Sequence, residues 1–134
     1  MICIPKEPRK VGIKEGKFYP CPEKQVCVST QAPKDDELHY IEPIKYEQSL
    51  EEVKNKVKTV INSMSRTKIL EESDNYLRVQ FTSFLFRFKD DVEFYFDDAS
   101  KILHFRSQSR IGGFDWGANR NRMEKFKEKY LNLK

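Results

Sequence analysis

The chain has 134 residues, of which 38% are hydrophobic and 34% charged, and its formal net charge is +4. This length fits one domain with a core of its own, and ten Phe and six Tyr residues favour a folded chain over a disordered one. No window approaches the roughly 20 apolar residues of a membrane span. The N-terminus has no apolar signal core, so the sequence predicts a cytoplasmic protein.

The positive charge is concentrated at the C-terminal end. Residues 99–134 carry nine basic and three acidic side chains. Such an end attracts anions through its summed field. It lacks the long Lys/Arg runs of nucleic-acid-binding proteins, so nucleic acid is not an expected partner.

Residues 1–47 contain all six prolines. Because proline fixes φ and removes a backbone donor, this segment is predicted to be an irregular N-terminal arm. Residues 48–134 form the body of the same single domain. It opens with a helix, in which Ser49 and Glu52 fit a capping box and apolar residues recur at helical spacing from Leu50 to Met64.

From Thr67 to Gln108 the apolar residues alternate with polar ones, as in strands buried on one side. The four alternating runs predict a four-stranded antiparallel meander, and their apolar positions are Leu77, Val79 and Phe81; Phe84, Phe86 and Phe88; Val92, Phe94 and Phe96; Leu103 and Phe105. The parity changes between Phe81 and Phe84, which predicts a bulge near residues 82–83.

Matching the apolar faces of these runs predicts their register. Arg87, Glu93 and Arg106 then lie side by side as a structural ion-pair group across three strands. Asp90 and Asp91 fall in a hairpin loop, where Asp is favoured. One of these carboxylates is expected to pin a nearby arginine.

The last helix is predicted over residues 115–131, with Asp115 as its N-cap. The order of elements is therefore arm, helix, strands and helix. This order predicts an α+β fold with both helices packed on the aromatic face of the sheet.

Three motifs resemble a known family, namely CPEKQVCVST (21–30), FRFKDDVEFYFD (86–97) and RSQSRIGGFDWGANRNRMEKF (106–126). In this order they resemble the domain of unknown function 1499 family, small proteins of bacteria and plant chloroplasts. The resemblance implies no established activity. Family members often carry an N-terminal membrane or export segment, which this sequence does not display. Two departures are Gln25-Val26, in place of Pro-Asn, and Gly113-Phe114, in place of glycine and an aromatic residue followed by serine.

Cys21 and Cys27 are separated by five residues. They are expected either as two structural thiols, the usual state in a cytoplasm, or as a disulfide or redox pair. Zinc needs four suitably spaced ligands, and the three cysteines and two histidines do not supply such spacing. No metal and no cofactor are therefore predicted.

Four arginines near the last helix form the main candidate binding site, together with Trp116: Arg106, Arg110, Arg120 and Arg122. Cations at a helix start are disfavoured by the helix dipole, so a carboxylate of the protein or a bound anion is expected to offset them. The glycines of this stretch lack the spacing of a phosphate-binding loop.

The preferred function is a non-enzymatic binding module for an anionic small molecule or an acidic protein partner. One alternative is an enzyme that uses the thiols of Cys21 and Cys27, or an acid–base pair of Tyr95 and His104, which face each other across two strands. The other is a structural accessory protein in which the arginines pair with internal carboxylates.

Overall fold

The structure, a computed structural model, describes residues 7–133; residues 1–6 of the predicted arm and residue 134 lie outside the described residues. Its elements follow in chain order: β1 (Ile13–Lys14), β2 (Lys17–Phe18), β3 (Cys27–Ser29), β4 (Ile44–Lys45), α1 (Leu50–Ser63), β5 (Thr67–Glu72), β6 (Tyr76–Thr82), β7 (Lys89–Asp97), β8 (Ile102–Ser109) and α2 (Ala118–Asn132). The α+β class predicted from the sequence is confirmed.

The main sheet has six strands rather than the four that were predicted. The strands β5, β6, β7 and β8 form an antiparallel meander, and β3 and β4 both add to β8 from the N-terminal segment. The arm is therefore not irregular throughout, because parts of it complete the sheet. A separate two-stranded ribbon, β1 and β2, lies in the same segment.

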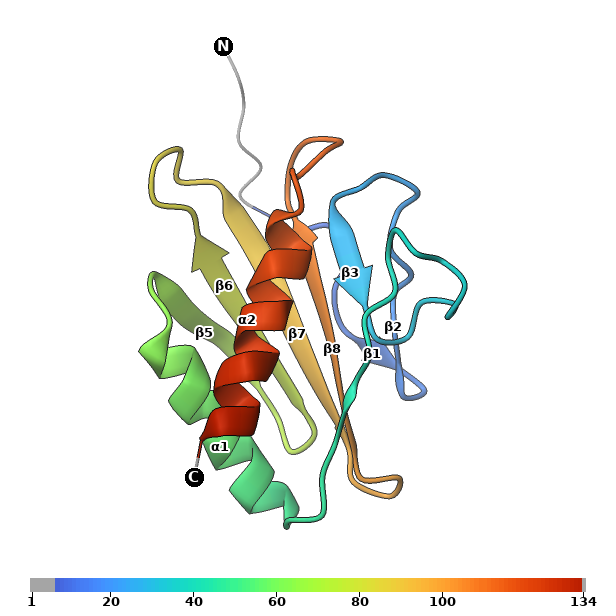
Figure 1. The fold of residues 1–134 in the computed structure, drawn as a ribbon, viewed down its shortest axis with the longest axis vertical. Helices are drawn as coiled ribbons and strands as arrows, with labels where there is room; N and C mark the ends of the chain where they lie inside the picture. The colour runs from blue at the N-terminus through green and yellow to red at the C-terminus, as the bar shows by residue number, and fades with distance from the viewer. Residues whose placement is uncertain (1–6, 134) are drawn as a thin grey trace.

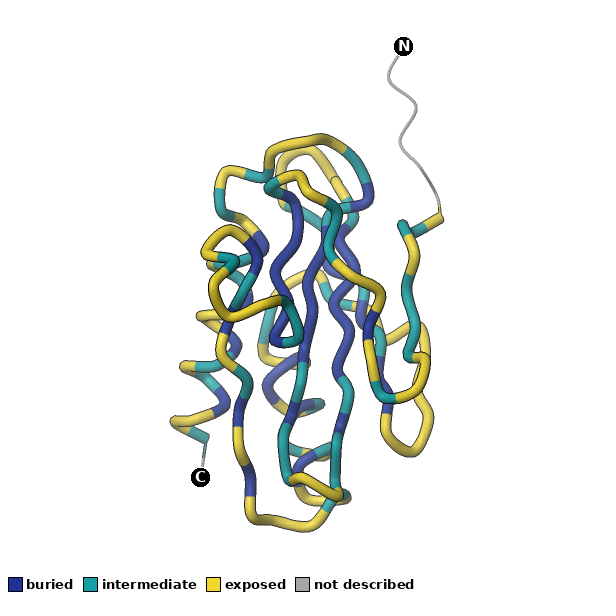
Figure 2. Tube along the Cα trace, turned by 90° about the vertical axis from the view of Figure 1, so that its right-hand side faces the viewer, coloured by how far each residue is buried: buried dark blue, intermediate teal, exposed yellow. Residues whose placement is uncertain are grey.

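Both helices cover one face of this sheet (Figure 1). Their apolar side chains join those of the strands in one core, in which the rings of Phe94, Phe105 and Phe126 pack against one another in tilted and edge-on pairs. The N-terminal segment runs along the opposite face, so the central strands are buried between the two layers (Figure 2). That opposite face carries the polar side chains of β7 and β8, and we call it the polar face.

The predicted strand over residues 84–88 is wrong. Residues 83–88 form a loop, and β6 pairs directly with β7, with Val79 opposite Val92 and Phe81 opposite Asp90. The change of parity after Phe81 marks the end of a strand rather than a bulge. The register irregularity of the sheet lies instead between Ile69 and Glu71 in β5.

The two helices begin differently. Ser49 caps α1 as predicted, because its hydroxyl accepts the amide of Glu52. The helix α2 begins three residues after the predicted cap, with Gly117 in the left-handed conformation at its N-cap. The Asp115 carboxylate still accepts the amides of Gly117 and Asn119. It therefore satisfies two backbone donors at the start of α2, although it is not the N-cap residue.

Candidate functional site

Arg106 lies in a buried network at the centre of the polar face. Its side chain is 2% exposed, and its Nη1 lies 2.9 Å from Glu93 Oε1, as the predicted register of β7 and β8 requires. Its Nη2 donates to the carbonyl of Pro20 and to Gln108. The amide of Gly12 donates to Glu93. The N-terminal segment therefore closes over this pair from outside the sheet.

Burial governs the electrostatics of this network. It lowers the pKa of the Arg106 guanidinium, and the charge of Glu93 opposes that shift. The second oxygen of Glu93 also accepts the hydroxyl of Tyr76 at 2.7 Å. The Glu93 carboxylate therefore has three donors, and neither charge faces solvent.

Arg110 belongs to a second ion-pair group on the same face. Its Nε and Nη2 both donate to Asp91, at 2.8 and 3.0 Å, and this bidentate contact raises the pKa of Arg110. Arg78 binds the same carboxylate at 3.0 Å. Asp91 is thus a buried strand residue with two arginine partners, and its predicted place in a hairpin loop is wrong.

Arg122 lies on the helix side of the sheet. Its Nη2 is 2.6 Å from Asp90, the first carboxylate of the predicted hairpin loop, which in fact belongs to β7. Burial raises the pKa of Asp90, and Arg122 opposes the shift. Arg122 also donates to Ser107 and Asn119, which link β8 to α2.

Arg120 has backbone partners instead of carboxylates. Its Nη2 donates to the carbonyl oxygens of Glu37, Leu38 and Tyr40, so it ties α2 to the N-terminal segment. All four arginines of the predicted binding cluster therefore have partners within the protein. They do not share one surface: Arg106 and Arg110 lie on the polar face, Arg122 on the helix side of the sheet, and Arg120 where α2 meets the N-terminal segment.

The predicted position of Arg87 beside Glu93 is wrong. Arg87 lies exposed in the loop of residues 83–88, and Arg78 stands opposite Glu93 in β6. The reason is that β6 ends at Thr82, so the three-residue hairpin that would place Arg87 in the sheet does not form.

Cys21 and Cys27 form a disulfide. Cys27 starts β3, whereas Cys21 follows Pro20, whose carbonyl accepts a hydrogen bond from Arg106. The disulfide therefore fastens the covering segment to the sheet beside the buried ion pair. In this state neither sulfur is a free thiolate, which a thiol nucleophile requires.

Tyr95 and His104 face each other as predicted, with their rings stacked at 6.3 Å between centroids. The hydroxyl of Thr30 accepts the amide of Phe105 and is hydrogen-bonded to His104 Nδ1 at 2.8 Å. Burial lowers the pKa of His104. The arrangement is a stacked pair, and within the described part of the chain the phenol is not hydrogen-bonded to the imidazole.

Trp116 lies in the loop before α2 and, at 85%, is the most exposed large hydrophobic residue between residues 7 and 133. It packs edge-on against Phe114, with 4.8 Å between ring centroids, and its own φ is +57°. This strained, outward position presents the indole to solvent.

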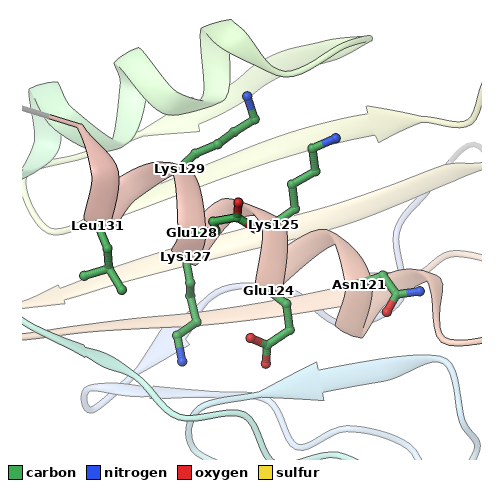
Figure 3. A pocket seen from close by; sticks show the side chains of 7 residues that line it. All are labelled: Asn121, Glu124, Lys125, Lys127, Glu128, Lys129 and Leu131. Atoms are coloured by element: carbon green, nitrogen blue, oxygen red, sulfur yellow. The ribbon is translucent and has the colours of Figure 1, made fainter.

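A cleft of about 300 Å³ lies between the end of α1, the end of β6 and α2. Its cations are Arg66, Arg122, Lys125 and Lys129, and no carboxylate is among its lining residues. We call it the basic cleft. Lys125 and Lys129 extend from the same side of α2, away from Glu124 and Lys127 (Figure 3). Among residues 7–133 neither lysine has an ion-pair or hydrogen-bond partner.

Only Arg122 of this cleft was selected from the sequence. The missed signal is the spacing of Arg122, Lys125 and Lys129, since residues at i, i+3 and i+7 share one helix face. Arg66 carried no such signal. It reaches the cleft because the turn after α1 places it beside Thr82, whose carbonyl accepts its Nε.

Comparison with known proteins agrees with the motif resemblance. The family model described as "Protein of unknown function (DUF1499)" matches residues 17–129, which include β2 to β8 and most of α2. A search of curated proteins found no significant match. Neither helix within residues 7–133 has the length and apolar character needed to cross a membrane.

Proposed function

We propose that this chain, which belongs to the DUF1499 family, is a non-enzymatic binding module that holds an anionic group of a small molecule or an acidic partner in the basic cleft. The observation that carries the proposal is the charge of that cleft: four cations line it without a carboxylate. Counting partners among residues 7–133, only Arg122 of these four is ion-paired, with Asp90.

Electrostatics favour an anion at this place. Lys125 and Lys129 are one helical turn apart, and like charges at this spacing destabilise a helix. An anion between them and Arg66 removes that repulsion. The hydroxyl-bearing side chains of Ser65, Thr82 and Ser83 line the cleft and offer hydrogen-bond donors to its oxygens.

The proposal moves the ligand from the cluster predicted from the sequence. Arg106 and Arg110 already have buried carboxylates as partners. A ligand at those residues must displace a carboxylate of the protein. A ligand in the basic cleft meets Lys125 and Lys129, which have no carboxylate partner in the described part of the chain. Of the predicted binding residues, the proposal retains Arg122 at the cleft and Trp116 as an exposed contact.

A second candidate is a structural accessory protein, and the buried ion pairs on the polar face favour it. We do not extend the proposal to catalysis, because Cys21 and Cys27 are joined and Tyr95 is stacked on His104.

Thermal unfolding in inorganic pyrophosphate tests the basic cleft. At ten times the dissociation constant a ligand stabilises the folded state by about 1.4 kcal/mol, which raises Tm by a few degrees. We expect this shift in the wild type and its loss in the double variant Lys125→Ala/Lys129→Ala.

The matched control is Lys17→Ala/Lys45→Ala, which removes two exposed lysines outside the cleft. It should keep the pyrophosphate shift when ionic strength is held constant with NaCl. Equal shifts in both double variants, or no shift in the wild type, would show that the basic cleft does not select anions.

A further inference from the structure

A loop beside the basic cleft exposes an unusual amount of apolar surface. Phe84, Leu85 and Phe86 are 70, 73 and 65% exposed, and Phe88 is partly exposed as well. We call residues 83–88 the aromatic loop. Contiguous exposed apolar side chains of this kind mark an interaction site on a soluble domain.

The aromatic loop holds its rings outward with a defined geometry. The amide of Ser83 donates to the carbonyl of Phe88 at 2.9 Å, and the Ser83 hydroxyl accepts the amide of Phe88 at 2.8 Å. The rings of Phe86 and Phe88 stack at 5.5 Å, and Arg87 turns the chain with φ +58°. The loop is therefore closed at its base, and its apolar side chains are presented rather than folded back into the core.

A second apolar tip lies at the same end of the molecule. The loop before α2 carries exposed Phe114 and Trp116, and both loops project from one end of the sheet in the two views of Figures 1 and 2. The backbone joins them there, since the amide of Arg110 donates to the carbonyl of Lys89. We call the exposed Phe84, Leu85, Phe86, Phe114 and Trp116 together the loop end.

Basic side chains surround the aromatic loop. Residues 82–89 contain Arg87 and Lys89 and no acidic residue. The guanidinium of Arg66 lies 5.4 Å from the centre of the Phe84 ring, and Arg66 also lines the basic cleft together with Ser83. The cleft and the aromatic loop are therefore one continuous surface, with an anion site next to projecting apolar rings.

We infer that the loop end docks on a membrane surface, with the basic cleft holding the headgroup of an anionic phospholipid. Projecting tips with Trp, Phe and Leu suit insertion at the boundary of headgroups and acyl chains, where aromatic rings are favoured. The surrounding cations complement an anionic leaflet. A protein partner would need matching hollows for two separate tips, whereas a bilayer receives both without them. This inference rests on the proposed anion site and names its ligand.

Vesicle co-sedimentation of the full chain tests the inference. We expect binding to vesicles with roughly a third phosphatidylserine and not to vesicles of phosphatidylcholine alone. The variant Phe84→Ser/Phe86→Ser should bind at least ~10-fold more weakly, because it removes two inserted rings. Lys125→Ala/Lys129→Ala should also lose more than ~10-fold. Leu38→Ser/Leu131→Ser, which removes exposed leucines outside the loop end, should bind like the wild type.

Trp116 gives an independent readout, because it is the chain's one tryptophan. Its emission should shift to shorter wavelength on phosphatidylserine vesicles and stay unchanged on phosphatidylcholine. Binding that survives the Phe84/Phe86 change, or sedimentation without an emission shift, overturns the inference. A pyrophosphate response that depends on Lys125 and Lys129 without any vesicle binding also overturns it, but leaves the proposed anion site standing and assigns the loop end to a protein partner. Loss of both responses removes both proposals.

Discussion

Replacing Arg106 by methionine tests whether the polar face is held by buried charge. The substitution keeps an unbranched side chain but removes the partner of Glu93, which is itself 0% exposed. Glu93 keeps the hydroxyl of Tyr76 and the amide of Gly12, each at 2.7 Å. Its charge is then uncompensated, and breaking a buried pair in this way costs about 3–5 kcal/mol. That is a large share of the roughly 5–15 kcal/mol that stabilise a domain.

The double variant Arg106→Met/Glu93→Gln separates charge from packing. A glutamine oxygen still accepts from Tyr76 and Gly12, but no ionised group stays buried. We expect the double variant to be more stable than Arg106→Met by about 1–3 kcal/mol, while the unpaired carbonyls of the N-terminal segment keep it below the wild type.

Urea unfolding at pH 7, followed by far-ultraviolet circular dichroism, measures both changes. The control is Arg87→Met, an exposed arginine whose loss should change the free energy of unfolding by less than about 0.5 kcal/mol. A cost below about 1 kcal/mol for Arg106→Met, or no recovery in the double variant, would refute the buried-charge argument.

Three further changes test other parts of the structure. The variant Cys21→Ser/Cys27→Ser should have a free energy of unfolding about 2 kcal/mol lower, measured in urea, because the disulfide closes a short loop in the unfolded chain. Equal urea midpoints for the oxidised wild type and the variant would contradict this. By the same assay, Asn119→Ala should lower the free energy of unfolding by about 2–3 kcal/mol, since the buried amide joins α2 to Ser107 and to the carbonyl of Val26. A change of less than about 0.5 kcal/mol, which is usual for surface substitutions, would count against that role. Burial puts the pKa of His104 in the folded protein below its ordinary value of 6.5. Between the folded and the unfolded pKa, the unfolded chain therefore binds more protons than the folded protein. The stability that His104 supplies above pH 6.5 should fall as the pH drops through 6.5 toward the folded pKa; His104→Gln should flatten this part of the stability curve, and identical curves would exclude the effect.

Local chemistry accounts for the parts of the fold that could be predicted. The start of α1 follows from Ser49 and Glu52, whose capping contacts span four residues. The register of β7 and β8 follows from a short connection, which leaves few ways to align Phe94 with Phe105 and Glu93 with Arg106. In both places the determining contacts lie close in sequence.

The errors arose where local pattern and tertiary environment disagree. Residues 84–88 alternate like a buried strand, yet their rings are exposed because the loop that carries them lies outside the core. Residues 67–72 form a real strand without a clear alternation, because β5 is an edge strand and five of its six residues are exposed. An alternating pattern indicates an apolar face. It does not specify whether that face packs against the core of the same chain.

The partners of the arginines were also beyond local reasoning. The strand β3 pairs with β8 about 80 residues later in the chain, with Cys27 opposite Gln108, and this pairing is what brings Pro20 and Gly12 over Arg106. No spacing in the sequence encodes such a contact. The burial of the Arg106–Glu93 pair depends on where the N-terminal segment packs against the sheet.

The C-terminal excess of positive charge therefore divides into two groups with different physical roles. Arg106, Arg110 and Arg122 pair with carboxylates of β7, and the planar guanidinium suits such fixed geometry. Lys125 and Lys129 are compact, hydrated charges on the outer part of α2, and their field is not cancelled by a partner within residues 7–133. Changes in Arg106 or Arg110 should alter stability and reduce anion binding only in proportion to the folded fraction, whereas Arg122 also lines the basic cleft and its loss should affect both. Changes in the second should alter anion binding and its salt dependence while the free energy of unfolding stays nearly constant.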